Sequence, residues 1–414
     1  MIQVDITSQN HIIAAIVKHP VLDKDQKLKK SYFHSHLCYS VSVFKSPHWF
    51  LMTKIIQTLT LGVLFAVTLS ANAVERLYYV AADEIEWDYA PKHFNLMMNM
   101  PLKDSQKVFV ESSDKTIGSK YKKAIYREYT DATFTTLKKR PAHEEHLGLL
   151  GPLFRAEVGD TIKVVFKNNG SLPYTIHPHG VFYTKANEGA PTNDGTSKAQ
   201  KGDDRVMPGT TYTYNWKVPE TAGPGPADNS SIVWVYHSHV QSIQDSNSGL
   251  VGAIIVTAKG MANPDGTPKD VDREFVNLYT VMDENESHFL DDNIKNYIGK
   301  DVDSEDEEFV EGNLMHMING YLFANLPGLN MVDGDKVRWH LIALGTEVDL
   351  HTPHWHGHTG LINGRRTDVV ELLPASMKTL DMTVNNPGTW MYHCHVNDHI
   401  SAGMTSLYHV APKK

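Results

Sequence analysis

Short runs in which apolar and polar residues alternate dominate most of the chain. Residues 74–88 alternate aromatic or apolar side chains with polar ones, and residues 107–110, 156–167 and 211–218 keep the same two-residue period. This period places successive side chains on opposite faces of a β-strand, and the Gly, Pro, Asn and Asp residues between the runs predict turns. Long stretches with the helical period of 3.6 are scarce. The pattern therefore predicts an all-β protein built from β-sandwiches.

The same pattern occurs twice along the chain. Three segments of the first half have counterparts in the second: residues 159–164 with 334–339, 174–180 with 351–357, and 236–239 with 392–395. Such self-similarity is typical of repeated structural units. Residues 259–269 contain two glycines and two prolines and predict a linker. We therefore expect two domains, at residues 74–262 and 263–414.

The segment that precedes these domains has the features of an export signal. Residues 52–73 have a basic residue, Lys54, near their start, continue as an apolar run over 55–69 and end in small residues. This predicts a secretory signal peptide that is cleaved after Ala73, with a membrane anchor as the alternative. We interpret residues 1–51 as an over-extended N-terminus, with Met52 as the true first residue. The mature protein is then secreted, to a periplasmic or cell-surface location.

Composition narrows the class of protein. The 414 residues are 41% hydrophobic and 21% charged, which is ordinary for a globular chain of two or three domains. The net charge of -9 gives no indication of nucleic-acid binding and is compatible with cationic substrates. Removal of the signal leaves Cys394 as the single cysteine, so no internal disulfide can form. Metal ligation would protect that thiol from oxidation.

The strongest chemical signal surrounds this cysteine. Cys394 lies between His393 and His395, and His399 and Met404 follow at intervals of five residues. A thiolate, an imidazole and a weak thioether suit copper in a blue electron-transfer site. In a strand, the two flanking histidines point to the face opposite the cysteine. They can therefore serve a second metal centre that is joined to the first through the backbone of one residue.

Histidines also recur in pairs with one residue between them. The four pairs are His177/His179, His237/His239, His354/His356 and His393/His395. Residues i and i+2 of a strand share a face, so each pair can present two imidazoles to one cavity. Eight imidazoles are too many for one ion and fit a cluster of three coppers. In the first half, Tyr174, Ser238 and Leu250 occupy the positions of His351, Cys394 and Met404. The first half therefore keeps the histidine pairs and lacks the blue-copper ligands.

These motifs resemble those of the animal multicopper ferroxidases, the ceruloplasmin and hephaestin family. The second half is similar to the last domain of that family at residues 283–287, 292–295, 306–309 and 318–320 and at the motifs around His351 and Cys394. The first half, from residues 78–80 and 87–90 onward, resembles the first domain. The resemblance implies two cupredoxin-like Greek-key β-sandwich domains. It also implies an oxidase that takes single electrons from a reductant and reduces O2 to water.

The resemblance further implies a set of ligands for about four copper ions per chain. The type 1 copper would be bound by His351, Cys394, His399 and Met404, and the type 2 copper by His177 and His354. The type 3 pair would be bound by His179, His237, His239, His356, His393 and His395. Electrons would pass from the type 1 copper through Cys394 to His393 and His395.

Fe(II) is the reductant that the resemblance implies. Glu311, His316 and Asp398 match three iron ligands of the family, and Glu347 matches the fourth. We expect Glu347 to come from a neighbouring subunit. Family members have six domains in a ring and share the copper cluster between the first and the last. A chain with two domains would reproduce that ring as a homotrimer with a closed head-to-tail interface.

Four other functions fit parts of the pattern. A laccase-like phenol oxidase or a cuprous oxidase would use the same coppers with a different reductant. A copper nitrite reductase is also a trimer of two-domain chains, but it has its blue copper in the first domain. A non-enzymatic copper-binding scaffold would lack the complete ligand set that is present here. Elsewhere, His143 and His146 predict an exposed polar turn, and residues 301–308 predict a solvated acidic loop.

Overall fold

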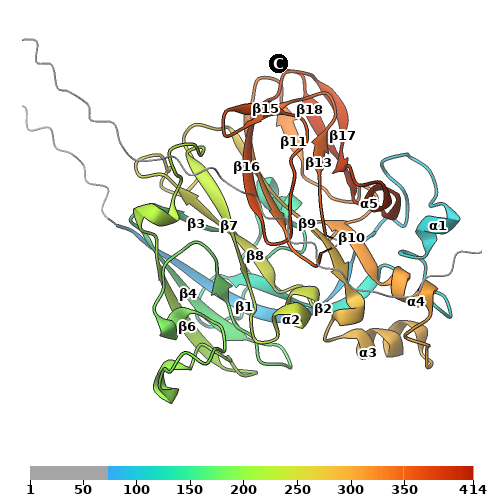
Figure 1. Cartoon of the computed structure of the whole chain (residues 1–414), viewed down its shortest axis with the longest axis horizontal. Helices are drawn as coiled ribbons and strands as arrows, with labels where there is room; N and C mark the ends of the chain where they lie inside the picture. The colour runs from blue at the N-terminus through green and yellow to red at the C-terminus, as the bar shows by residue number, and fades with distance from the viewer. Residues whose placement is uncertain (1–72, 348, 414) are drawn as a thin grey trace, which may run out of the picture. The chain divides into compact units, whose positions relative to one another are not determined.

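The computed structural model describes residues 73–347 and 349–413, which belong to one unit, Val67–Lys414. Their strands form four sheets, two from each half of the chain (Figure 1). The all-β prediction is confirmed. Apart from Ala73, the predicted signal at 52–73 and the segment 1–51 lie outside the described residues. Within the described ranges, no helix is long and apolar enough to cross a membrane.

Eight strands make up the sheets of the first half. They are β1 (Glu75–Asp88), β2 (Lys120–Tyr129), β3 (Phe154–Glu157), β4 (Thr161–Asn168), β5 (His177–Pro178), β6 (Thr211–Lys217), β7 (Ser231–His237) and β8 (Val251–Thr257). One sheet has the order β2-β1-β4-β6 and the other β3-β8-β7-β5. Along β4, Ile162, Val164 and Phe166 are buried while the residues between them are half-buried, which is the period expected of a sandwich.

The second half contains ten strands. They are β9 (Arg273–Asp283), β10 (Leu314–Ile318), β11 (Asn330–Val332), β12 (Lys336–Ala343), β13 (Pro353–Trp355), β14 (Gly360–Ile362), β15 (Arg365–Thr367), β16 (Met377–Thr383), β17 (Gly388–Cys394) and β18 (Thr405–Ala411). Their sheets have the orders β10-β9-β12-β16-β14-β15 and β11-β18-β17-β13. The pair β9/β12 is parallel, as is β1/β4, and β11/β18 is parallel, as is β3/β8. The two halves thus share the order of the first four strands in each sheet, and β14 and β15 extend one sheet of the second half. The domain boundary at 262/263 stays a prediction.

Helices are short and lie between strands. The α-helices are α1 (Asp104–Lys107), α2 (Ser242–Asn247), α3 (Leu290–Asn293), α4 (Glu307–Gly312) and α5 (Asn397–Ala402). The remaining helical turns are η1 (Ala142–Leu147), η2 (Lys185–Asn187), η3 (Lys198–Gln200), η4 (Glu220–Ala222), η5 (Glu284–Glu286) and η6 (Ile294–Ile298). Asp306 caps α4 by accepting hydrogen bonds from the backbone N–H groups of Glu308 and Phe309. The acidic segment 301–308 is therefore a loop only up to the start of α4.

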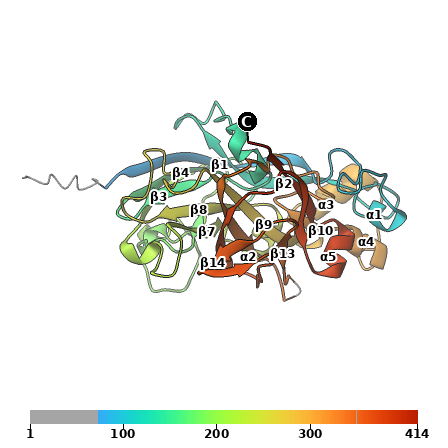
Figure 2. The same cartoon turned by 90° about the horizontal axis from the view of Figure 1, so that it is seen from above.

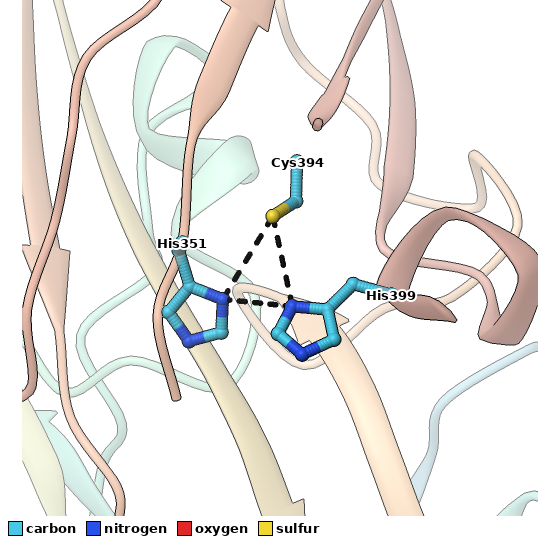
Figure 3. Close-up of side chains that lie close together, drawn as sticks. All are labelled: His351, Cys394 and His399. Carbon is cyan, nitrogen blue, oxygen red and sulfur yellow. Dashed lines mark hydrogen bonds between the residues drawn. The ribbon is translucent and has the colours of Figure 1, made fainter. Parts of the chain in front are cut away.

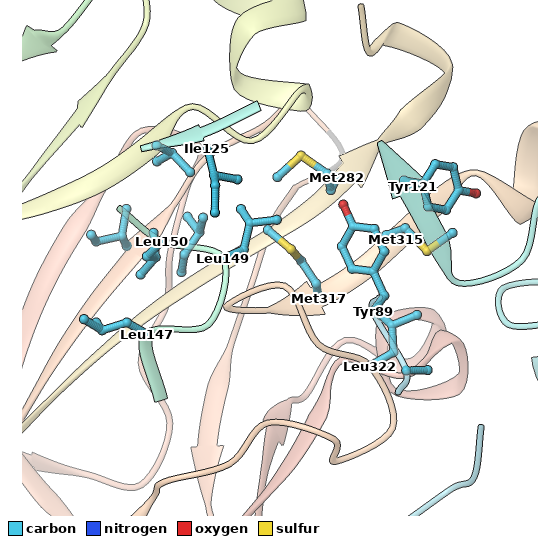
Figure 4. Packing of buried hydrophobic residues seen from close by; sticks show 14 of the residues in the cluster. Tyr89, Tyr121, Ile125, Leu147, Leu149, Leu150, Met282, Met315, Met317 and Leu322 are labelled. Atoms are coloured by element: carbon cyan, nitrogen blue, oxygen red, sulfur yellow. The ribbon is translucent and has the colours of Figure 1, made fainter. Parts of the chain in front are cut away.

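Three apolar clusters hold the described residues together. One lies inside the second half, one consists of first-half residues together with Phe289, and the third contains many residues of both halves. In this third cluster, Tyr89 and Leu149 of the first half pack with Met282 and Met317 of the second (Figure 4). From both directions of view, β9 and β10 run between β8 and α5 (Figure 1; Figure 2). Burial of this shared apolar surface fixes the two halves against each other.

One sequence prediction is wrong in this region. His146 was expected in an exposed turn, but its side chain is buried. Its Nε2 accepts a hydrogen bond from the Val276 N–H at 3.0 Å, and its Nδ1 lies 3.1 Å from the carbonyl oxygen of His143. The reason is that η1 packs against β9, a contact between halves that the local sequence does not reveal.

Candidate metal centre

Three buried side chains converge where β17 ends. Cys394 Sγ lies 4.0 Å from His351 Nδ1 and 3.6 Å from His399 Nδ1, and the two nitrogens lie 3.2 Å apart (Figure 3). A point equidistant from the three atoms lies about 2 Å from each, within the usual range of metal–nitrogen and metal–sulfur bonds. One thiolate and two imidazoles in this arrangement fit a single soft ion such as copper.

Backbone contacts in the last forty residues position these side chains. α5 carries His399 and ends at Gly403, whose φ of 109° lets the chain turn back toward β17. The Met404 N–H then donates to the His399 carbonyl at 2.9 Å, and the Cys394 N–H donates to the Met404 carbonyl at 3.1 Å. Met404 is fully buried in the same apolar cluster as Cys394. The loop thus keeps all three predicted ligands of this segment together.

The surroundings of Cys394 favour its thiolate form. Burial by itself would raise the pKa of the thiol. Contacts from His351 and His399 and the Thr352 N–H, which lies 3.3 Å from Sγ, outweigh it and lower the pKa to about 6. The thiolate is the form that binds metal, so the side chain is prepared for ligation at neutral pH.

Asp349, which the sequence did not single out, contacts the predicted ligand His351. Its Oδ1 lies 3.3 Å from His351 Nε2, and the carboxylate also accepts from the N–H groups of Val281 at 2.6 Å and Thr346 at 2.7 Å. Burial opposes ionisation of Asp349, but these hydrogen bonds outweigh it and hold the pKa of the carboxyl below its usual value. Metal-bound histidines commonly donate their second N–H to a carboxylate. A carboxylate two residues before His351 was the available signal.

On the second half, the predicted cluster histidines form one group. β13 pairs with β17 so that His354 lies opposite His393. His356 Nε2 lies 3.1 Å from His393 Nε2, and the ring centroids of His354 and His395 lie 5.4 Å apart. The arrangement follows the expected strand geometry, in which side chains two residues apart share a face.

The first half repeats this arrangement. β5 pairs with β7 so that His177 lies opposite His237. His179 Nε2 lies 3.2 Å from His237 Nε2, and the ring centroids of His177 and His239 lie 5.0 Å apart. Each half therefore gathers four of the eight predicted imidazoles. Within residues 73–347 and 349–413, no imidazole of one group stacks on or hydrogen-bonds to an imidazole of the other.

Backbone carbonyls set the tautomers of four of these histidines. The Nδ1–carbonyl distances are 2.7 Å for His177 to Glu188, 2.9 Å for His237 to Ser238, 2.9 Å for His354 to Asp368 and 2.6 Å for His393 to Cys394. Because a carbonyl only accepts, Nδ1 carries the proton and Nε2 keeps a free lone pair. Burial, helped by neighbouring imidazoles, lowers the pKa of His237 to about 3 and that of His179 to about 4. The rings of His179 and His237 are therefore neutral ligands at pH 7.

The first half has a polar contact where the second has its thiolate. The Thr175 N–H donates to Ser238 Oγ at 3.1 Å, as the Thr352 N–H approaches Cys394 Sγ. Ser238 in turn donates to buried Asp245 at 2.6 Å. The Ser238 N–H donates to the Leu250 carbonyl at 3.1 Å, the contact that Cys394 makes with Met404. The predicted correspondence of Ser238 and Leu250 with the blue-site ligands therefore agrees with the backbone contacts.

The four candidate iron residues line one cavity of about 780 Å³. Glu311, His316, Glu347 and Asp398 all contribute to its wall, beside His399. The His316 ring centroid lies 5.1 Å from that of His399. Burial, and then the charge of Asp398, raise the pKa of Glu311. Glu347, which we expected from a neighbouring subunit, lines the cavity of its own chain.

These residues are less tightly arranged than the copper candidates. Among the described residues, two sets of three candidate ligands have their ligand atoms within 4.8 Å of one another: His351, Cys394 and His399, and His354, His356 and His393. Glu311, Glu347 and Asp398 belong to neither set. Asp398 and Glu347 are exposed, while His316 is buried with its Nδ1 2.9 Å from the Leu314 carbonyl. This suits a cavity that receives a solvated ion more than a closed site.

Comparison with known families gives a consistent result. Two family models described as multicopper oxidase match residues 128–260 and 295–414, together more than half of the chain. Hephaestin of Mus musculus is 45% identical over 344 residues, which cover 81% of this chain and 28% of hephaestin. Ceruloplasmin of Homo sapiens is 44% identical over 343 residues, which cover 81% of this chain and 31% of ceruloplasmin. The chain thus spans less than a third of the length of these relatives.

Solved structures share the fold at lower identity. A multicopper oxidase called mgLAC is 20% identical, with a TM-score of 0.53 and coverage of 81% of this chain and 86% of its own. A blue copper oxidase from Nitrosomonas europaea is also 20% identical, with a TM-score of 0.51 and coverage of 82% and 86%. These likenesses agree with the cupredoxin-like sandwiches seen in the four sheets.

Proposed function

This chain belongs to the multicopper oxidase family, and we propose that it couples the oxidation of Fe(II) to the reduction of O2 to water. The observation that carries the proposal is the contact between two sites. The buried triangle of His351, Cys394 and His399 touches a carboxylate-lined cavity through the neighbouring rings of His399 and His316. An electron donor in that cavity would lie next to the electron-accepting ligands.

Copper would be held by the residues that converge. At the first site these would be His351, Cys394 and His399, together with the predicted ligand Met404, whose thioether is buried in the same cluster. At the second they are the two groups of four imidazoles. When bound, copper supplies a one-electron acceptor at the first site and the four-electron reduction of O2 at the second. The protein contributes a buried thiolate, four imidazoles whose tautomers are fixed by backbone carbonyls, and a backbone link from Cys394 to His393 and His395.

The charge of the cavity supports a cationic reductant. Its lining includes six carboxylates: Asp283, Glu286, Glu311, Glu347, Asp349 and Asp398. Its lining residues, all in the described part of the chain, include no lysine or arginine. A cleft lined by one sign of charge concentrates ions of the opposite sign. Carboxylates with one imidazole suit Fe(II) better than a phenol. A relative in Mus musculus that is named as a ferroxidase is 44% identical over 344 residues, 82% of this chain.

A homotrimer would complete the oxygen-reducing site. The two imidazole groups lie on separate sheets of one chain, and type 3 copper needs ligands from both. Exposed apolar side chains lie near the predicted metal ligands of each half: Phe182 is 52% exposed five residues after His177. Leu373 is 63% exposed beside Leu372, whose backbone pairs with His351 of the blue-copper triangle. A closed ring in which the first half of one chain meets the second half of the next would cover them. Export through the predicted signal at 52–73 would leave a mature protein in which Cys394 is the single cysteine.

Oxygen consumption by the copper-loaded protein tests the reductant. Glu311→Gln and Asp398→Asn are expected to reduce kcat/KM for Fe(II) by about tenfold or more, equivalent to about 1.4 kcal/mol, because each removes a predicted iron ligand. Rates with a bulky phenol should stay unchanged. Glu286→Gln is the matched control, because it removes an exposed carboxylate of the same cavity that matches none of the family's iron ligands. Equal losses with Fe(II) and phenol, or faster phenol oxidation by the wild type, would favour a laccase-like oxidase.

A further inference from the structure

Behind the second-half imidazole group lies a buried hydrogen-bonded pair, Tyr408 and His358. Tyr408 is on β18 and is fully buried, and His358 is 6% exposed. The Tyr408 hydroxyl contacts the carbonyl oxygen of His356 and lies 2.7 Å from His358 Nδ1. His356 is one of the predicted type 3 ligands. The pair therefore reaches a ligand through its backbone and not through its ring.

The direction of each hydrogen bond follows from counting protons. The His356 carbonyl can only accept, so the single proton of the Tyr408 hydroxyl is donated to it. The hydroxyl oxygen must then accept from His358, which fixes the His358 proton on Nδ1. His358 Nε2 is left with a lone pair, and it is buried without a hydrogen-bond partner. The ring lines a surface cavity of about 610 Å³.

The first half has apolar residues at the positions of this Tyr408–His358 pair. In β7/β8, His237 pairs with Val251 and Trp234 with Ile254. In β17/β18, His393 pairs with Thr405 and Trp390 with Tyr408. Ile254 therefore occupies the place of Tyr408. Val181 follows His179 at the same interval at which His358 follows His356.

The two halves also satisfy the equivalent carbonyl in different ways. In the first half, the His179 carbonyl accepts from the Val181 N–H at 2.9 Å. In the second half, the corresponding carbonyl of His356 accepts from the Tyr408 hydroxyl. The shared framework thus folds with an apolar Val/Ile pair. Packing alone does not account for a Tyr–His pair with an unpartnered nitrogen, because a buried polar group without a partner costs about 1–3 kcal/mol.

We propose that Tyr408 and His358 are positioning residues for the copper ligand His356. Tyr408 holds the backbone carbonyl of His356 by a hydrogen bond, and His358 fixes the orientation of the Tyr408 hydroxyl. Together they set the His356 ring so that its Nε2 stays 3.1 Å from His393 Nε2. The inference rests on the proposed function, because it requires His356 to bind type 3 copper. Supporting contacts to metal ligands commonly contribute about 10–100-fold to metal affinity.

Stepwise copper removal from the loaded protein tests the proposal. Copper content and the near-ultraviolet absorption of the two type 3 coppers are followed against chelator concentration. The blue absorption of the Cys394 site is the internal reference. Tyr408→Phe and His358→Val should release type 3 copper at about 10–100-fold lower chelator concentration, with the blue site unchanged. His358→Gln keeps an N–H donor and should restore much of the retention. Tyr78→Phe is the control, since its phenol also donates to a backbone carbonyl, that of Arg155, at 3.2 Å.

Different results would overturn the positioning role of Tyr408 and the proposed oxidase function. If the wild type binds the two type 3 coppers and the Tyr408→Phe variant retains them equally well, the positioning role alone is overturned. Parallel loss of the blue and type 3 signals in Tyr408→Phe would also overturn it, because that result indicates general destabilisation. If the wild type never binds two type 3 coppers, the proposed function and this inference are overturned together.

Discussion

His393 Nδ1 lies 2.6 Å from the carbonyl oxygen of Cys394 and donates its proton to it. The residue that supplies the thiolate thus also fixes the tautomer of a neighbouring cluster ligand. The first half keeps the same contact between His237 and Ser238, at 2.9 Å, although its thiolate is absent. The histidine–carbonyl contact is therefore part of the shared framework, and among the described residues only the second half adds a thiol beside it.

Cys394→Ser should abolish the blue site and leave the fold intact. Ser238 already occupies the equivalent position with the same backbone donor, so the substitution copies an arrangement that this framework accepts. Visible absorption should disappear, copper content should fall by one ion per chain, and oxygen consumption with any reductant should drop to background. Persistence of the blue absorption would show that the thiolate is not a ligand.

Asp349→Asn should weaken the blue site selectively. The neutral amide can no longer hold His351 Nε2 as a charged acceptor, although it can still accept from the Val281 and Thr346 N–H groups. The affinity for type 1 copper should fall by about 10–100-fold. Copper titration of the apo protein, followed by blue absorption, measures this. An unchanged affinity would assign Asp349 a purely structural role in the turn before His351.

Phe182→Glu should dissociate the proposed trimer and leave the blue site intact. Placing a charge on this exposed apolar side chain opposes burial in an interface between chains. Sedimentation should detect monomers, and these should keep the blue absorption while losing type 2 and type 3 copper. The matched substitution Met98→Glu changes another exposed apolar residue, 58% accessible, in the turn that pairs Asn95 with Met100. A monomer that carries all coppers and is active would rule out the trimer.

His146 should make the protein acid-sensitive. Burial is the main cause that lowers its pKa from 6.5 to about 3 in the folded state. The unfolded chain therefore binds more protons between these values, so stability is full above pH 6.5 and falls as the pH decreases toward 3. The loss is at most about 1.4 kcal/mol per pH unit. His146→Gln, which keeps a donor and an acceptor, should flatten this part of the pH dependence of Tm. An unchanged slope would assign the acid sensitivity to other groups.

The repeated sequence pattern predicted the fold well because it reflects a local rule. Alternation along residues such as Ile162, Val164 and Phe166 depends only on which face of a strand is buried. The histidine pairs were predictable for the same reason, since i and i+2 share a face. The prediction for His146 was wrong because its burial depends on β9, which lies more than a hundred residues away along the chain.

The sequence by itself determined the residue types of the metal sites: one cysteine, the histidine pairs and a methionine at fixed local spacings. Only the tertiary structure decided which of these side chains meet, because His351, Cys394 and His399 converge from three separate elements. It also decided that Asp349 supports His351, that Glu347 shares the cavity of Glu311 within one chain, and that Tyr408 lies behind His356. Such contacts arise from the packing of strands distant in sequence, and local periodicity carries no information about them.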